Sequence, residues 1–275
     1  MKTKCLVLGV LLLSFTSLVG ATSPAPIAGR WAASMFFDGP GQYSYSSNLF
    51  QLHEFLNDAA PEISFNFGSC ASFCIGLAGD WNGDGIDTVG VYEPSINEFR
   101  LRNSNSTGAA DIVFNFGTCG PSGCLPVVGD WDGNGVTSVG LYNPTTNQFQ
   151  LRNSNTAGSA DITFSYASCS GNACLPIAGR WTGAGFSATG FYNPATNQFF
   201  LRNTLSSGAA DTTISFGQCG LNCLPVAGDW NGAGADIIGL YHLERHKFLL
   251  RSSNSAGPPS YAFFFNAIYI DGFEQ

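Results

Sequence analysis

The sequence predicts an all-β protein, a five-bladed β-propeller built from five repeats of about 50 residues with four strands each. Three observations predict this fold: a tandem repeat, four strand-like runs in each copy, and an almost constant spacing between copies. All five tryptophans lie 50, 50, 50 and 49 residues apart, at Trp31, Trp81, Trp131, Trp181 and Trp230. A phenylalanine follows each of them in register, at Phe50, Phe99, Phe149, Phe199 and Phe248, and a leucine comes two residues later.

Each copy contains four short runs fit for strands, separated by turns rich in Gly, Asn, Pro and Ser. In the third copy the runs are 125–131, 138–142, 148–152 and 161–166. Uniform spacing between the repeats favours a closed ring, because every blade of a ring must fill the same angular wedge. The alternative is an open stack of small sheets. The predicted repeats are about 27–76, 77–126, 127–176, 177–225 and 226–270 within a propeller domain of 22–270.

Composition excludes two classes of protein. Hydrophobic residues make up 44% of the 275 residues and charged residues 11%, against about 25% charged in an average globular protein. A disordered chain is therefore excluded. The formal net charge is −8 and no basic stripe is present to neutralise phosphates, so nucleic acid is not expected as a partner.

Residues 1–21 are typical of a signal peptide. Two lysines precede an apolar run. The run is followed by Val19-Gly20-Ala21, whose small residues suit a signal peptidase cleavage site. The run is too short and too polar at its end to favour the alternative, a membrane anchor. We therefore expect an exported protein, secreted outside the cell or into a periplasm, with no membrane span after cleavage and a short C-terminal tail at 271–275.

Eight cysteines form four local pairs at the junctions between repeats. The pairs are Cys70/Cys74, Cys119/Cys124, Cys169/Cys174 and Cys219/Cys223. An even number of cysteines in an exported chain predicts disulfides. Zinc is disfavoured because the spacing lacks C-x-x-C knuckles and the three histidines lie elsewhere.

An acidic loop follows the tryptophan strand in the second repeat. Asp80, Asn82 and Asp84 occupy positions 1, 3 and 5, with glycine at position 6. Alternate oxygen side chains and a tight glycine turn are what a small loop needs to surround a hard cation. The alternative is that these are Asx and glycine turn residues without a metal.

Gly-Asp-Trp-Asn-Gly-Asp-Gly at 79–85 resembles the FG-GAP and VCBS-type repeats of integrin-like propellers, and the resemblance extends over about 27–270. It implies calcium, bound weakly, in loops between the first two strands of some blades. The implied ligands in the second repeat are Asp80, Asn82, Asp84 and the Ile86 carbonyl, with Asp87 one residue earlier than the usual closing acid. In the third repeat they are Asp130, Asp132 and Asn134.

These features together predict a binding or interaction module, outside the cell or at its surface, for a glycan or protein ligand. The tryptophans are expected to fill blade interfaces, the alternative being sugar-stacking platforms. The alternative function is a secreted polysaccharide hydrolase or lyase with its site in the central channel. No catalytic residue is identified, because most acidic residues recur at the same position in successive repeats, as structural residues do.

Overall fold

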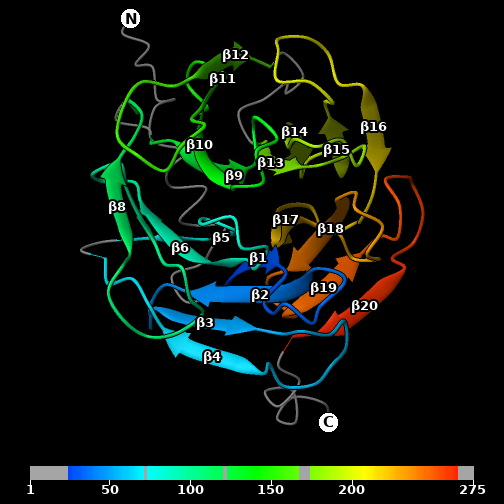
Figure 1. The fold of residues 1–275 in the computed structure, drawn as a ribbon. Helices are drawn as coiled ribbons and strands as arrows, with labels where there is room; N and C mark the ends of the chain where they lie inside the picture. The colour runs from blue at the N-terminus through cyan, green and yellow to red at the C-terminus, as the bar shows by residue number, and fades with distance from the viewer. Residues whose placement is uncertain (1–23, 71–72, 120–122, 167–173, 266–275) are drawn as a thin grey trace, which may run out of the picture.

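The computed structural model describes residues 24–70, 73–119, 123–166 and 174–265 (Figure 1). The predicted signal peptide and the predicted tail at 271–275 lie outside the described residues. Over the described ranges the chain forms twenty β-strands and one 3-10 helix, η1 (Gly220–Asn222).

The strands form five four-stranded antiparallel sheets, each built from consecutive strands. In blade order the bounds are β1 (Ala25–Gly29), β2 (Gly39–Ser44), β3 (Leu49–Leu52), β4 (Ile63–Asn66); β5 (Ile75–Gly79), β6 (Thr88–Glu93), β7 (Glu98–Leu101), β8 (Ile112–Asn115); β9 (Leu125–Gly129), β10 (Ser138–Asn143), β11 (Gln148–Leu151), β12 (Ile162–Ser165); β13 (Leu175–Gly179), β14 (Ala188–Asn193), β15 (Gln198–Leu201), β16 (Thr212–Ser215); β17 (Cys223–Gly228), β18 (Ile237–His242), β19 (Lys247–Leu250) and β20 (Tyr261–Phe264). The predicted all-β, five-bladed propeller is confirmed.

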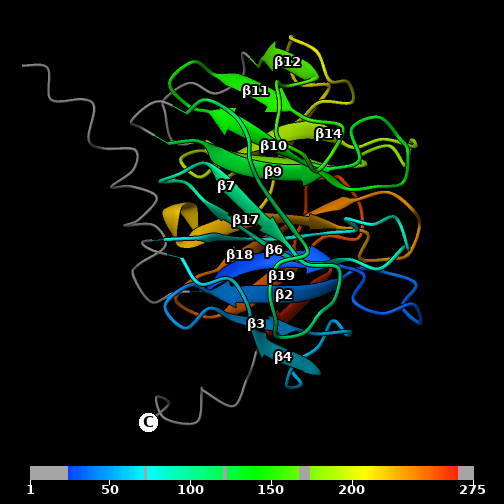
Figure 2. The ribbon, with the colours of Figure 1, turned by 60° about the vertical axis from the view of Figure 1, so that its left-hand side comes forward.

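The first strand of every sheet lies innermost, and these strands close a ring. β1 contacts β5, β5 contacts β9, β9 contacts β13, β13 contacts β17, and β17 returns to β1. Blades 5 and 1 meet without exchanging a strand, because each sheet is complete from one stretch of chain (Figure 1). In Figure 2 the loop between β1 and β2 lies at one end of the ring and η1 at the other.

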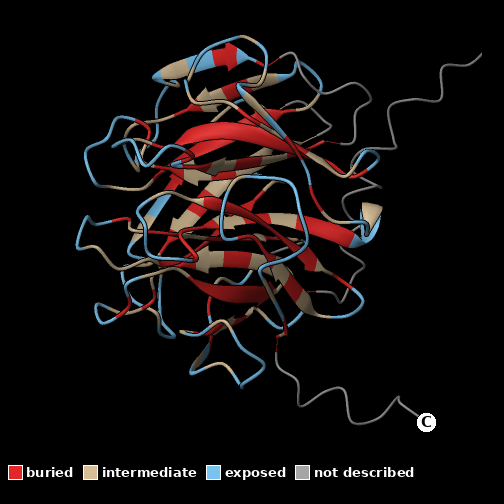
Figure 3. Cartoon of the chain, turned by 90° about the vertical axis from the view of Figure 1, so that its right-hand side faces the viewer, coloured by how far each residue is buried: buried red, intermediate tan, exposed pale blue. Residues whose placement is uncertain are grey.

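Period-2 alternation places apolar side chains in the interior. In β11, Phe149 and Leu151 are buried while Gln148 and Gln150 are half-buried, as expected for a strand whose successive side chains point to opposite faces. Burial follows the central strands of each blade, and exposed residues follow the loops (Figure 3). All five tryptophans are buried, which confirms them as interior filling and leaves no free indole face for stacking on a sugar.

Each turn between the second and third strands contains a residue with positive φ. The residues are Asn48, Asn97, Asn147, Asn197 and His246, with φ of 52°, 52°, 53°, 52° and 48°. Asparagine tolerates this left-handed conformation better than most residues. The hydroxyl of Tyr142 donates a hydrogen bond to Asn147 Oδ1 at 2.8 Å, and the same tyrosine–asparagine pair recurs in blades 1, 2 and 4.

Disulfides tie the blade junctions at Cys70–Cys74, Cys119–Cys124 and Cys219–Cys223. The fourth predicted pair includes Cys169, which lies outside the described residues. In the described part of the chain, no helix has the length and apolar character needed to cross a membrane.

Candidate functional site: a polar cavity on the propeller axis

A cavity of about 370 Å³ lies where the five innermost strands end, and all five blades line it. Each innermost strand ends in glycine followed by a charged residue. These strand-end residues are Arg30, Asp80, Asp130, Arg180 and Asp229. Side chains are absent from the preceding glycines, and a Cβ at Gly79 would lie 2.4 Å from Thr137 Cγ2. The glycines therefore allow neighbouring blades to approach closely around the axis.

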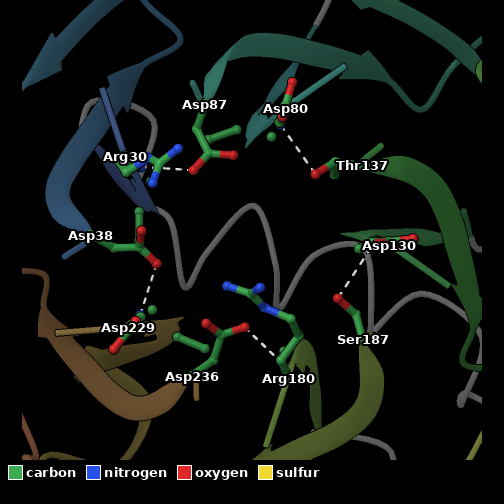
Figure 4. Close-up of a pocket in the computed structure, with 18 of the residues that line it drawn as sticks. Arg30, Asp38, Asp80, Asp87, Asp130, Thr137, Arg180, Ser187, Asp229 and Asp236 are labelled. Carbon is green, nitrogen blue, oxygen red and sulfur yellow. Dashed lines mark hydrogen bonds between the residues drawn. The ribbon is translucent and has the colours of Figure 1, made fainter. Parts of the chain in front are cut away.

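A second ring of polar residues joins each blade to the next. We call them latch residues: Asp38, Asp87, Thr137, Ser187 and Asp236 (Figure 4). Each latch side chain accepts a hydrogen bond from the backbone N–H of a strand-end residue. The donor and acceptor pairs are Arg30 N to Asp87 Oδ2 (2.7 Å), Asp80 N to Thr137 Oγ1 (3.1 Å), Asp130 N to Ser187 Oγ (3.1 Å), Arg180 N to Asp236 Oδ2 (2.7 Å) and Asp229 N to Asp38 Oδ2 (2.8 Å).

Every latch is reciprocal. The latch residue's own N–H donates to the carbonyl oxygen of the same strand-end residue, at 2.8 Å for Asp87, 2.7 Å for Thr137, 2.6 Å for Ser187, 3.0 Å for Asp236 and 2.9 Å for Asp38. Two hydrogen bonds at each of five junctions satisfy backbone groups at the strand ends that would otherwise lack partners. The ring around the cavity is thus held by the same contacts that join the blades.

The predicted calcium ligands of the second repeat all lie in the loop between β5 and β6. Asp80 Oδ1 accepts hydrogen bonds from the Gly83 and Asp84 amides at 2.7 and 3.1 Å, and its Oδ2 accepts from the Gly85 amide at 2.7 Å. Asp84 Oδ1 accepts from the Ile86 amide at 2.9 Å, and Asn82 Nδ2 donates to Asp84 Oδ2 at 2.9 Å. Asp87 instead turns to Arg30 of blade 1.

The third repeat has the same loop. Asp130 accepts from the amides of Gly133, Asn134 and Gly135 at 2.9, 3.0 and 2.9 Å. Asp132 Oδ1 accepts weakly from the Asn134 amide at 3.3 Å. Calcium in either loop stays a prediction. Among the described residues, the one group of three His, Cys, Asp or Glu ligand atoms within 4.8 Å of one another is Cys70, Cys74 and Glu93, and its two cysteines are joined as a disulfide.

The strand-end side chains point in different directions. Figure 4 shows the carboxyl groups of Asp80 and Asp130 turned outward, whereas the side chain of Arg180 extends toward the middle of the cavity. The Arg30 guanidinium is fixed, because its Nε donates to the Gly85 carbonyl oxygen at 2.7 Å. The Arg180 guanidinium has no hydrogen-bond partner in the described part of the chain. The cavity therefore presents carboxyl, hydroxyl and guanidinium groups together.

The latch carboxyls are difficult to ionise. Burial raises the pKa of Asp38 to about 8, and the charges of Asp87, Asp236 and Asp229 add to the rise. Burial raises the pKa of Asp87 to about 6, against the opposing effect of the Arg30 amide and guanidinium. Burial also raises the pKa of Asp236, while the amide and guanidinium of Arg180 lower it. These side chains are half-buried in the lining of the axial cavity, where part of their hydration is lost.

The latch was not predicted from the sequence, although a signal for it exists. Four latch residues lie seven positions after their own blade's strand-end residue and Asp38 lies eight after Arg30, and every copy carries a hydrogen-bond acceptor there. The pattern is hard to recognise because the residue at this position varies among aspartate, threonine and serine from one repeat to another. The family resemblance implies calcium for Asp87 instead, because this residue lies one position before the usual closing acid.

Comparison with known proteins gives little further information. No family model matches the chain, and no curated protein sequence matches it. Among solved structures, the chain is similar to one described as the crystal structure of BBS1N in complex with ARL6DN, soaked with mercury. The identity is 7%, the match covers 89% of this chain and 69% of that chain, and the TM-score is 0.38. Membership of the FG-GAP or VCBS family therefore stays a prediction.

Proposed function

We propose that this chain is an exported binding module whose ligand site is the axial cavity, with a glycan or a protein as ligand. The observation that carries the proposal is the cavity itself, about 370 Å³ in volume and lined by all five blades. Binding sites are typically concave and contain a few converging polar groups. The carboxyl and hydroxyl oxygens of the latch residues suit a ligand that donates hydrogen bonds.

An exposed aromatic residue supports the same location. Phe36 is 86% exposed and lies on the loop between β1 and β2, in the lining of the cavity. The corresponding loops of the other blades are shorter and rich in glycine. An aromatic face beside polar groups suits contact with a sugar ring or an apolar side chain.

A binding screen with purified, oxidised protein tests the proposal, using a glycan array and a set of exported proteins. We expect a ligand whose affinity falls at least tenfold in Phe36→Ala. Phe55→Ala is the matched control, because Phe55 is 51% exposed but lies outside the cavity lining. A ligand equally affected by both substitutions, or by neither, contradicts the proposed site.

One observation favours the second candidate function, polysaccharide hydrolysis or elimination. Burial raises the pKa of Asp38 to about 8 and that of Asp87 to about 6, so the two carboxyl groups differ in how readily they ionise. Two carboxyls of different acidity facing one cavity are what acid–base cleavage of a glycoside requires. Turnover of a polysaccharide that is lost in Asp87→Asn would favour this function over binding alone.

A further inference from the structure

The charges at the five blade junctions follow a rule with one exception. Where the strand-end residue is arginine, the latch residue is aspartate, as in Arg30–Asp87 and Arg180–Asp236. Where the strand-end residue is aspartate, the latch is a neutral hydroxyl, as in Asp80–Thr137 and Asp130–Ser187. The junction between blades 5 and 1 instead joins two acids, Asp229 and Asp38.

That exceptional junction is also the one at which the ring closes. No disulfide joins blades 5 and 1 in the described part of the chain, and they are not consecutive in sequence. Beyond the latch, Ala25, Ala28 and Leu56 of blade 1 pack against the apolar cluster of blades 4 and 5, and polar contacts also cross this junction. Tyr241 donates its hydroxyl hydrogen to Gln42 Oε1 at 3.0 Å, and the Phe264 amide donates to Asp58 Oδ1 at 2.6 Å.

Gln42 distinguishes this junction from the others. The corresponding positions in the other four blades hold Val91, Leu141, Phe191 and Leu240, all buried apolar residues. Phe191, for example, packs against Tyr142 of the preceding blade with ring centroids 4.8 Å apart. Blade 1 therefore meets blade 5 through hydrogen bonds at a position where the other blades use apolar contact.

Separating blades 5 and 1 would relieve part of what disfavours a charged Asp38. Burial raises the pKa of Asp38 most; among the charges, Asp87 of blade 2 contributes most, followed by Asp236 and then Asp229 of blade 5, whereas the hydrogen bond from the Asp229 amide lowers this pKa. The remaining charged side chains that line the cavity are Arg30, Asp80, Asp130 and Arg180. At the two Arg–Asp junctions burial also raises the pKa of the latch carboxyl, but the arginine across the junction, Arg30 or Arg180, opposes that rise.

We propose that the junction of blades 5 and 1 is a proton-dependent closure, tight when Asp38 carries a proton and loosened when Asp38 is charged. This inference goes beyond the proposed function and does not depend on it. The junctions closed by Thr137 and Ser187 do not share the dependence, because their latch side chains are neutral hydroxyls.

The direction of the pH effect follows from linkage. The pKa of Asp38 in the folded protein lies above its ordinary value of 3.8, so the folded protein holds this proton more tightly than the unfolded chain does. The stability contributed by that proton is fully present below pH 3.8. It is lost progressively as the pH rises through about 8.

Hydrogen exchange of the intact protein tests the closure, with amide rates corrected for intrinsic exchange at each pH. We expect protection of β1 and β17 to fall by up to about tenfold per pH unit between about pH 6 and pH 8 and to level off above, because Asp38 is then charged in the closed and the open junction alike. Protection of β5 and β9, which meet at the Asp80–Thr137 latch, is the internal control and should change little.

Two variants make the result specific. Asp38→Asn keeps a side-chain oxygen as acceptor and removes the charge, and Asp38→Thr copies the latch of blade 3. In both variants the fall in protection at β1 and β17 should disappear. An equal fall at the control junction in wild type, or a pH dependence that persists in whichever variant folds, would overturn the proposal.

Discussion

Asp80 and Gly85 are joined by a hydrogen bond of 2.7 Å from the Gly85 amide to Asp80 Oδ2. Together with the two bonds at Oδ1, this contact makes Asp80 the organising residue of its loop. An acidic loop of this kind therefore holds its shape through its own amides. The same oxygens have remaining lone pairs and are the ones that the sequence assigns to calcium.

Calcium is expected to raise the melting temperature, with a dissociation constant of about 0.1 to 1 mM, the range of extracellular modules. Asp84→Asn should reduce the calcium-dependent rise, because it removes a charge and keeps the acceptor for the Ile86 amide. The measurement is thermal unfolding in millimolar calcium and in chelator. Thr182→Ala, in the blade 4 loop that lacks a strand-end carboxylate, is the control. An identical melting temperature in both solutions for wild type excludes a stabilising calcium.

Thr137→Val tests the latch between blades 2 and 3. Valine keeps the shape of threonine but cannot accept the Asp80 N–H, and an amide left without a partner costs about 1 to 3 kcal/mol. Urea unfolding measures the loss. Thr163→Val, the same change at an exposed position of β12, should stay within about 0.5 kcal/mol of wild type. Equal stabilities of the two variants would contradict the latch.

Thr189→Val should stabilise the protein by about 1 kcal/mol. Thr189 is 0% exposed, and its hydroxyl has no hydrogen-bond partner in the described part of the chain. The corresponding positions of three other blades hold Val89, Val139 and Ile238. Urea unfolding checks this, with the exposed Thr213→Val as control. A destabilised Thr189→Val protein would show that the hydroxyl has a partner, such as a buried water.

Replacing Cys119 and Cys124 together by alanine should lower the free energy of unfolding by about 2 kcal/mol, the chain-entropy value for a loop of this length. The residues are five apart in sequence. Chemical unfolding of oxidised protein provides the measurement, and wild type under reducing conditions should lose more because all its disulfides open. If the double variant is as stable as wild type, this disulfide does not stabilise the junction.

The propeller could be predicted because its determinants are local and repeated. The tryptophan spacing, the alternation in runs such as 148–151, and the cysteine pairs all lie within one repeat or at its end. Strands of four to six residues with buried alternate positions then form as expected. The acidic loops were also predictable as loops, since their contacts span only two to five residues.

The cavity and its latches could not be predicted, because their contacts join residues far apart in the chain. Arg30 and Asp87 are separated by 57 residues, and Asp38 and Asp229 by 191. The acceptor that recurs seven or eight positions after each strand-end residue marks the latch position but not its partner in the next blade, and the family resemblance implies calcium instead for Asp87.

The amino-acid sequence by itself determined the repeat, the strands within each repeat and the cysteine pairs, since hydrophobic period and turn chemistry act over a few residues. Tertiary structure alone decided which side chains face the axis and that two acids, Asp38 and Asp229, meet where the ring closes. The physical reason is that ring closure sets these distances, and the energy of a buried carboxyl depends on the charges that closure places around it.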